Sequence, residues 1–354
     1  MKIGLTSNES RPEAHVASAP CRDRRLGVYP PGHRKLGGGR PSRPQTMQAL
    51  QNILNEDRAS LSPSKFSEED FEEFQDQEMQ PGREADTVVD IVPVIAGSAD
   101  VRLRKGREVL YSNAAPIVPE VKFPKPDKLY GASASQIAVH VRRDIGSHIM
   151  PSKSDSPFVP NFTMEAKSKS GNADVVQRQA VNNGAFGARA MHSLQNYGWP
   201  AVYDNKAYAL GATYHDGQLK VYATHPVQAS EDACFEKEYY TTQLNSYAMT
   251  GTRAEFRQGA TAYRNARDWA QARRDEIIEC ANNRFLESAV APSRQSHCSQ
   301  STRISALESS DDQDLRISSD TSADELLGPN TPIKRQRRRP HQRSLHPPAQ
   351  VSIL

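Results

Sequence analysis

Apolar and polar side chains alternate along residues 159–167, whose sequence is Val-Pro-Asn-Phe-Thr-Met-Glu-Ala-Lys. A period of two predicts a β-strand with one apolar and one polar face, because successive side chains point to opposite sides of a strand. Glu165 and Lys167 then lie side by side on the polar face. The segment from Ser168 to Asn172 interrupts the alternation, and Asn172 is a suitable N-cap for a following helix.

The pattern continues as a mixture of helices and strands between residues 65 and 287. It predicts a capped helix that begins at about Ser67, further helices at about 84–94, 133–145, 173–195 and 253–286, and further strands at 206–214, 218–224 and 239–248. The two strands at 206–224 are joined by His-Asp-Gly, a strong hairpin signal. We therefore expect an α/β (α+β) fold in which helices flank a mixed sheet.

The predicted helix at 173–195 carries small residues every four positions, at Ala180, Gly184 and Ala188. Glycine inside a helix costs about 1 kcal/mol relative to alanine, so this stripe indicates close packing against the sheet. Gln177 lies one turn before the stripe and should face the end of the strand that carries Glu165. Gln179 is rotated by roughly 100° around the helix axis from Ala180, so the stripe alone does not direct its side chain to the sheet. Either glutamine could bind a water molecule or a phosphate, and a surface glutamine is the alternative.

Composition divides the chain of 354 residues into three parts. Mean hydropathy is −0.71 and 36% of the residues are apolar, which indicates that part of the chain lies outside a packed core. Residues 1–64 predict a disordered basic arm rich in Pro, Gly and Arg, with a short helix at 46–54. Residues 65–287 form the folded domain, and residues 288–354 predict a disordered tail rich in Ser and Asp.

The tail contains a basic run that is typical of a nuclear-import signal. Five of the six residues from 334 to 339 are basic, namely Lys334, Arg335, Arg337, Arg338 and Arg339. A nonspecific nucleic-acid tail and a chance basic run are the alternatives. The run predicts a nuclear import receptor as a partner and a nuclear location, with the cytoplasm as the second choice.

Charge and cysteine content exclude several classes but do not select a function. The 45 basic and 42 acidic residues give a net charge of +3, so the overall balance does not indicate a nucleic-acid partner. The four cysteines form no Cys-x-x-Cys pair, and the sequence predicts neither a zinc module nor a disulfide framework. It contains no signal peptide and no apolar segment of the ~20 residues that span a bilayer, so we expect no membrane association.

Three charged residues predict the chemistry. Asp127, in the proline-rich segment Lys-Pro-Asp-Lys, and Glu165 are two acids that could bind Mg²⁺ or Mn²⁺. Lys167 could then orient or activate the attacking water. The alternatives are a turn residue for Asp127 and an ordinary ion pair for Glu165 and Lys167. Glu84 could be a further acid of the site, although a surface role is the simpler interpretation.

Basic residues on the predicted helices could contact nucleic-acid phosphates. They are Arg178, Arg264 and Arg267. Arg267 is followed by Asp268 and the long helix alternates charges elsewhere, so a solvated, salt-bridged helix is the alternative.

The order of Pro-Asp, Glu-x-Lys and a helix with glutamine resembles the PD-(D/E)XK nuclease superfamily. More closely, residues 125–131, 159–167, 178–180, 187–192, 201–208 and 263–270 resemble an uncharacterised domain common in filamentous fungi, over about residues 65–287. The resemblance implies a restriction-endonuclease-like fold. It also implies Asp127 and Glu165 as metal ligands, Lys167 as the catalytic lysine and Gln179 as the family's glutamine. The position of Gln177, one turn before the stripe of small residues, favours Gln177 instead.

Three functional hypotheses follow from these observations. The first is a Mg²⁺- or Mn²⁺-dependent nuclease that hydrolyses phosphodiester bonds in DNA, or in RNA. The second is an inactive nuclease-like domain that binds nucleic acid or a nuclear partner. The third is a protein-interaction module in which Glu165 and Lys167 pair with each other.

Overall fold

The structure is a computed structural model, and it describes residues 27–35, 38–80, 84–100, 103–117, 122–153, 156–230 and 235–290. The predictions for residues 1–26 and 291–354, including the basic run at 334–339, lie outside these ranges.

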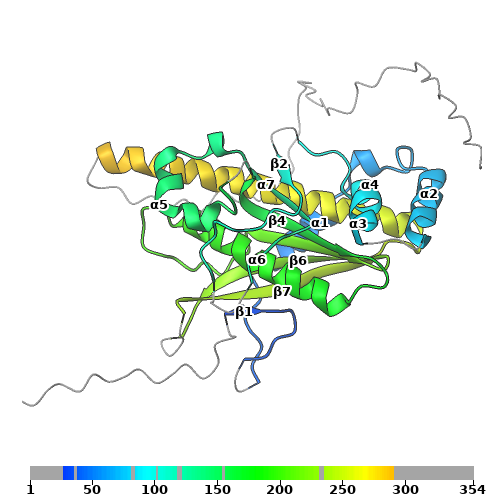
Figure 1. Ribbon diagram of the computed structural model, residues 1–354, viewed down its shortest axis with the longest axis horizontal. Coiled ribbons are helices and arrows are strands. Elements are labelled where there is room, and N and C mark those ends of the chain that lie inside the picture. Colours follow the sequence, from blue (N-terminus) through cyan, green and yellow to red (C-terminus); the bar gives the residue numbers. More distant parts are fainter. Residues whose placement is uncertain are drawn as a thin grey trace, which may run out of the picture. The chain divides into compact units, whose positions relative to one another are not determined.

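A seven-stranded mixed sheet forms the centre of the fold, in the order β1-β7-β6-β5-β4-β3-β2 (Figure 1). The strands are β1 (Val28–Tyr29), β2 (Arg104–Gly106), β3 (Lys128–Ala132), β4 (Phe158–Lys167), β5 (Ala209–His215), β6 (Gln218–Gln228) and β7 (Lys237–Ala248). The pairs β1–β7 and β4–β5 are parallel, and the other pairs are antiparallel. The predicted mixed sheet with flanking helices is therefore confirmed.

Helices surround the sheet close to their predicted positions. They are α1 (Met47–Leu54), α2 (Glu68–Met79), α3 (Glu84–Asp86), α4 (Val92–Ala96), α5 (Val139–Ile149), α6 (Ala173–Gln195) and α7 (Arg253–Val290). Short 3₁₀ turns lie at η1 (Ala59–Leu61) and η3 (Ala134–Gln136), and a π-helical turn, η2 (Thr87–Ile91), joins α3 to α4. Ser67 caps α2 through a reciprocal capping box with Asp70.

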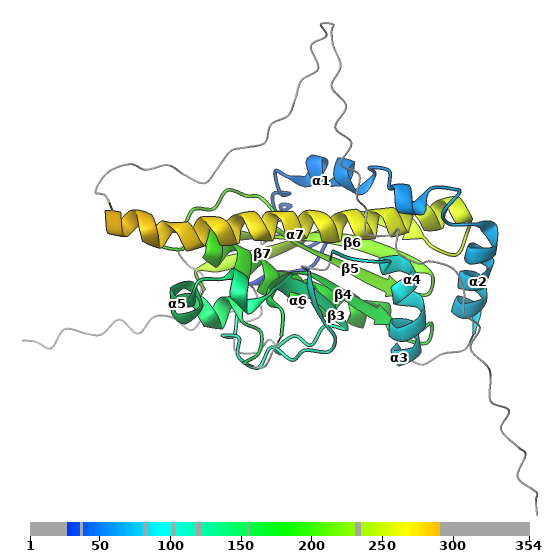
Figure 2. The ribbon, with the colours of Figure 1, turned by 90° about the horizontal axis from the view of Figure 1, so that it is seen from above.

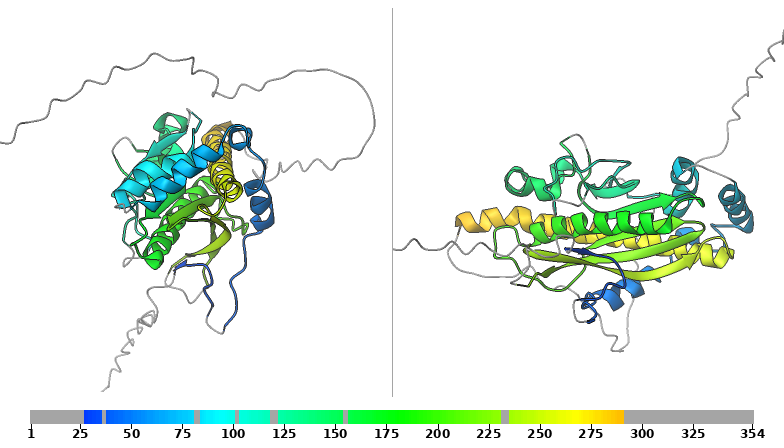
Figure 3. Two further views of the ribbon diagram at one scale, coloured as in Figure 1. Left: turned by 90° about the vertical axis from the view of Figure 1, so that its right-hand side faces the viewer. Right: turned by 60° about the horizontal axis from the view of Figure 1, so that its bottom comes forward.

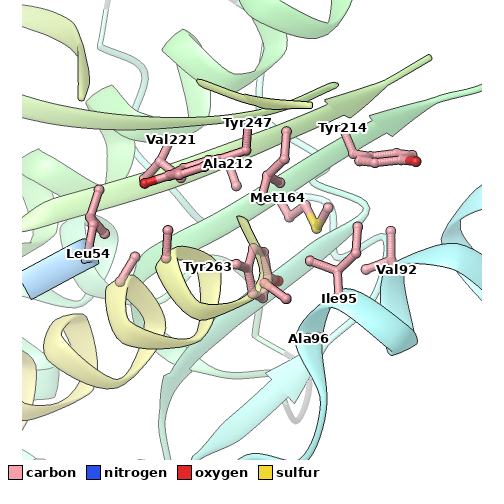
Figure 4. Close-up of a cluster of buried hydrophobic side chains, with 14 of the residues drawn as sticks. Leu54, Val92, Ile95, Ala96, Met164, Ala212, Tyr214, Val221, Tyr247 and Tyr263 are labelled. Atoms are coloured by element: carbon pink, nitrogen blue, oxygen red, sulfur yellow. The ribbon is translucent and has the colours of Figure 1, made fainter. Parts of the chain in front are cut away.

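The helices α6 and α7 cover opposite faces of the sheet (Figures 2 and 3). On the α7 side, the apolar positions of β4 join a large core with the helix. Phe162 packs edge-on against Tyr263 of α7, with ring centroids 5.1 Å apart. Met164, Tyr214 and Ile95 lie in the same cluster (Figure 4). From Phe162 to Ala166 the alternation thus sends the apolar side chains to α7, while Glu165 faces α6. Asn161 is an exception, because its side chain hydrogen-bonds Ala270 and Arg274 of α7.

The small residues of α6 bring this helix onto the sheet, as the stripe predicted. A Cβ atom at Gly184 would lie 2.3 Å from Oγ1 of Thr224 on β6, and one at Gly187 would lie 2.9 Å from the carbonyl oxygen of Pro160. No ordinary side chain fits at these distances. The close approach places the polar face of β4 directly under α6.

Folded structure begins earlier than the predicted boundary at residue 65. Val28 and Tyr29 pair with Tyr239 and Tyr240 as the edge strand β1. Leu50 of α1 and its i+4 neighbour Leu54 are buried in the core shared with α7. The composition of residues 27–64 resembles a solvated arm, but two leucines at helical spacing supply an apolar face that packs on the domain. The short helix predicted at 46–54 is confirmed.

Two further observations bear on the predictions. Cys280 of α7 is disulfide-bonded, although the spacing of the cysteines predicted no disulfide framework. Within the described residues, no helix combines the length and the hydropathy that a bilayer span requires.

We predict that Gly184→Ala destabilises the protein by about 1–3 kcal/mol, the usual cost of overpacking, because the added methyl group meets Thr224. An isolated helix would gain about 1 kcal/mol from the same change, so the sign of the effect separates packing from helix propensity. Urea denaturation followed by circular dichroism measures it. Arg178→Ala, at an exposed position of the same helix, is the control. A Gly184→Ala protein as stable as the wild type would contradict the close contact.

Candidate functional site

Asp127 and Glu165 face each other across the strands β3 and β4. The antiparallel register pairs Lys128 with Met164, so the preceding residue, Asp127, falls opposite Glu165. The carboxylate oxygen Oδ2 of Asp127 accepts a hydrogen bond of 2.7 Å from the backbone N–H of Ala166. The register therefore unites two acids that 37 residues separate in the sequence.

Glu165 is held from the other side by helix α6. Its side chain is 1% exposed, and Oε1 accepts a hydrogen bond of 2.6 Å from Nδ2 of Asn183. The second oxygen, Oε2, is buried and has no hydrogen-bond partner among the described residues. A buried carboxylate oxygen without a donor is costly, so this atom requires a proton or a cation.

The two acids perturb each other. Burial, and next the charge of Asp127, raise the pKa of Glu165 from 4.5 to about 8. Burial likewise raises the pKa of Asp127, and the charge of Glu84 adds to the rise, while the hydrogen bond from Ala166 and the charge of Lys167 oppose it. Two carboxyl groups in one buried space cannot both ionise cheaply. The pair therefore retains a proton near neutral pH unless a cation replaces it.

Lys167 lies on the same face of β4, two residues beyond Glu165, but its ion-pair partner is Glu84. The ammonium group, with its side chain 13% exposed, contacts the carboxylate of Glu84 on α3. The sequence-based alternative in which Glu165 and Lys167 pair with each other is thus wrong, although Lys167 is near enough to favour the charged form of Glu165. Glu84, considered only as a further acid, adjoins the site directly before the π-helical turn η2.

Helix α6 presents a line of polar side chains to the site. Gln179 and Asn183 are one turn apart and Gly187 follows after another turn, so the three lie on the face that packs against β4. Oε1 of Gln179 is buried without a partner among the described residues. Since Asn183 contacts Glu165 and α6 runs back along β4, Gln179 lies about 6 Å further toward the Lys167 end.

Gln177 faces the sheet, as expected, but over another strand. Its side chain hydrogen-bonds Tyr222 of β6, two strands away from β4. Helix geometry therefore puts Gln179, and not Gln177, on the side of α6 that faces β4.

Two residues of the site did not emerge from the sequence. Asn183 could have been found, because it is a polar residue at i+4 from Gln179 and i−4 from Gly187, on the stripe that packs against the sheet. Tyr111 gave no signal: it lies in an irregular segment, where its ring packs edge-on against Phe186 of α6 at 5.8 Å. Its hydroxyl group is buried without a partner among the described residues, and burial and the charge of Glu165 raise its pKa.

The predicted phosphate-binding arginines have different positions. Arg178 is exposed on α6 and remains a candidate. Arg264 and Arg267 are buried and donate hydrogen bonds to backbone carbonyl oxygens at the end of α4, those of Val94, Ile95, Ala96 and Ser98. The last carbonyl groups of a helix lack intrahelical partners, so these arginines act as its C-terminal cap. We therefore remove Arg264 and Arg267 from the predicted nucleic-acid contacts.

The chemistry of the donors fits a hard divalent cation. Asp127 and Glu165 supply carboxylate oxygens, and the unpartnered Oε2 atom of Glu165 is an available ligand. No group of three or more His, Cys, Asp or Glu side chains suited to a metal occurs in the part of the chain that the structure describes. Mg²⁺ commonly binds through one or two carboxylates and keeps several waters, so a pair of acids suffices for it, whereas a structural zinc site needs four protein ligands.

The domain thus has an α+β fold, a seven-stranded mixed sheet with helices on both faces and a pair of carboxyl groups contributed by β4 and the residue before β3. A family model described as a domain of unknown function (DUF7924) matches residues 70–281. The chain belongs to this family. No match was found among curated proteins.

We predict that Glu165 makes the protein less stable as pH rises from about 5 to 8. The folded state holds its proton up to a pKa of about 8, whereas the unfolded chain releases it near 4.5, so unfolding loses a proton in this window. The half-buried His148 and the buried His192 and His225, whose pKa values burial lowers to about 4, act in the opposite direction up to about pH 6.5. The wild type and Glu165→Gln share these histidines, so the contribution of the histidines cancels in the difference between the unfolding free energies of the two proteins.

That difference is measured by urea denaturation at several pH values without divalent cations. Relative to the wild type, Glu165→Gln should gain on the order of 2 kcal/mol of stability between pH 5 and 8, since one pKa unit corresponds to about 1.4 kcal/mol. Glu72→Gln, at an exposed position on α2, is the control and should show no such trend. Parallel pH profiles for the wild type and Glu165→Gln would show that Glu165 ionises normally.

Proposed function

We propose that this domain is a metal-dependent nuclease of the PD-(D/E)XK type that hydrolyses phosphodiester bonds in DNA. The observation that carries the proposal is the pair of carboxyl groups of Asp127 and Glu165 in a largely buried space, where Oε2 of Glu165 has no hydrogen-bond partner among the described residues. An acid pair of this kind costs folding free energy, and a catalytic cation would compensate for that cost. The resemblance of Pro-Asp, Glu-x-Lys and the following helix to that superfamily supports the same function.

Each residue of the site has a role in this proposal. Asp127 and Glu165 would hold Mg²⁺ or Mn²⁺, which supplies an activated water and stabilises charge on the phosphate. Asn183 fixes one oxygen of Glu165 and so directs the other toward the metal position. Lys167 lies at the end of the same strand, where its ammonium group can orient the attacking water. Gln179 can donate its amide protons to that water or to a phosphate oxygen.

The substrate and the location are part of the proposal. Arg178, which is exposed beside Gln179 on α6, would contact the phosphate backbone of DNA, or of RNA. The basic run at 334–339 would bind a nuclear import receptor and bring the protein to DNA in the nucleus. The resemblance to a domain of filamentous fungi covers about residues 65–287, which include the carboxyl pair and Arg178.

One observation favours a second candidate, an inactive nuclease-like domain that binds nucleic acid or a nuclear partner. Lys167 already has a carboxylate partner in Glu84, and an ammonium group held in an ion pair is less available to a water molecule. In this case the residues of the site would serve the fold, and nucleic acid would bind without being cut.

The test is cleavage of plasmid and single-stranded DNA, with RNA as a further substrate, in Mg²⁺ or Mn²⁺. We expect metal-dependent cutting by the wild type and a loss of at least about 100-fold in Lys167→Met, the usual scale for a group that assists the attacking water. Glu165→Gln removes a metal ligand and should lose at least as much. Lys169→Met is the matched control, because Lys169 is an exposed lysine two residues beyond Lys167. It should retain full activity.

The controls separate the two candidates. All variants are purified in the same way, so equal cutting by the wild type and Glu165→Gln would indicate a contaminating nuclease and contradict the proposal. Binding of DNA without cutting by any variant would support the inactive domain. A protein that neither cuts nor binds nucleic acid would exclude both.

A further inference from the structure

A cavity of about 430 Å³ lies at the edge of the sheet that β2 forms, opposite the edge formed by β1. It is lined by residues of β2, β3 and the end of α4. Its charged lining residues are Lys105, Arg107 and Lys128. No Asp or Glu is among the residues that line it. The cavity is therefore a concave surface whose charge is entirely positive.

Strand register directs the three basic side chains into this cavity. In the antiparallel pair β2–β3, Lys105 lies opposite Tyr130 and Gly106 opposite Leu129, so Arg107 follows opposite Lys128. Lys105 and Arg107 are two residues apart and point to one face. Lys128 points to this face as well, whereas its neighbour Asp127 points to the other. The cavity and the carboxyl pair thus lie on opposite sides of β3.

These cations have no carboxylate partner among the described residues, although ion pairs form close by. Lys125 pairs with Glu108 at 2.8 Å, immediately next to Arg107. Lys128 is half-buried and shares the lining of the cavity with Lys105 and Arg107, so three like charges face one space. An anion in the cavity would relieve this repulsion.

The remaining residues that line the cavity are apolar or aromatic, so one of its walls is apolar. Pro93, Ala96 and Ala99 come from α4 and the segment after it, and Tyr130 comes from β3. The volume falls in the range of about 300–1,000 Å³ that is usual for small-molecule sites and exceeds the ~30 Å³ share of a water molecule more than tenfold. The site is thus too large for a bare ion and has one basic and one apolar side.

We propose that this cavity binds a phosphate monoester of nucleotide size. Lys105, Arg107 and Lys128 contact the phosphate group, and the wall around Tyr130 covers the less polar part of the ligand. Arginine and lysine are the side chains that bind phosphate most strongly, through charge-assisted hydrogen bonds. The ligand is either a free nucleoside monophosphate or the phosphorylated end of a nucleic-acid strand. Because β3 separates it from Asp127 and Glu165, this site does not depend on the proposed nuclease activity.

Calorimetric titration with adenosine monophosphate in EDTA tests the proposal, because no divalent cation then occupies the carboxyl pair. We expect saturable binding that weakens at least tenfold in Arg107→Gln and in Lys128→Gln. Lys125→Gln is the matched control: it removes an exposed lysine of the same segment, outside the cavity, and should bind as the wild type does. Arg107 is exposed, so its variant should keep the wild-type thermal stability.

Two comparisons identify the ligand chemistry. Adenosine without the phosphate should bind at least tenfold more weakly than the monophosphate. Tighter binding of an oligonucleotide with a 5′-phosphate than of both the monophosphate and the 5′-hydroxyl oligonucleotide would assign the site to a strand end. Otherwise the free nucleotide is the ligand.

Glu165→Gln should bind adenosine monophosphate as the wild type does, which separates this site from the proposed nuclease centre. Absence of saturable binding, or equal losses in Lys125→Gln and Lys128→Gln, would overturn the proposal.

Discussion

The rest of this structure depends on the interaction between the carboxyl groups of Asp127 and Glu165, which lie opposite each other on neighbouring strands. Two carboxyl groups share a space in which one oxygen of Glu165 has no donor among the described residues. Burial raises the pKa of both groups, and the charge of Asp127 raises the pKa of Glu165 further. A fold that served stability alone would gain by replacing such a pair with apolar side chains. Its presence is best explained by a species that neutralises it, a proton or a divalent cation.

The rest of the fold holds this pair in place from two sides. The antiparallel register of β3 and β4 brings Asp127 opposite Glu165, and the N–H of Ala166 fixes Asp127. The tight approach of α6, which Gly184 and Gly187 permit, brings the amide of Asn183 to Glu165. On the opposite face, the core beneath α7 anchors β4 through its apolar side chains. The alternation of one strand thus separates the apolar core from the face that carries Glu165.

Much of this arrangement could be read from the sequence. Periodicity predicted β4, α6 and the hairpin with useful bounds, because each has a strong local signal. Charge patterning failed for Arg264 and Arg267, since a sequence does not show which arginine caps a buried helix end. It also missed the partner of Lys167, because the contact with Glu84 joins segments far apart in the chain. Tyr111 could not have been found, since it lies in an irregular segment whose position only tertiary packing determines.

A crystal structure of the protein soaked in Mn²⁺ at pH 8 would test the central claim most directly, through the anomalous signal of the metal. We expect a peak between Asp127 and Glu165, about 2.0–2.6 Å from a carboxylate oxygen of each residue, the range of hard-cation distances. We also expect Glu165→Gln crystals soaked in the same way to lose the peak. A wild-type structure with no peak at this position, or with the two carboxyl groups joined by a shared proton despite the metal, would contradict the claim.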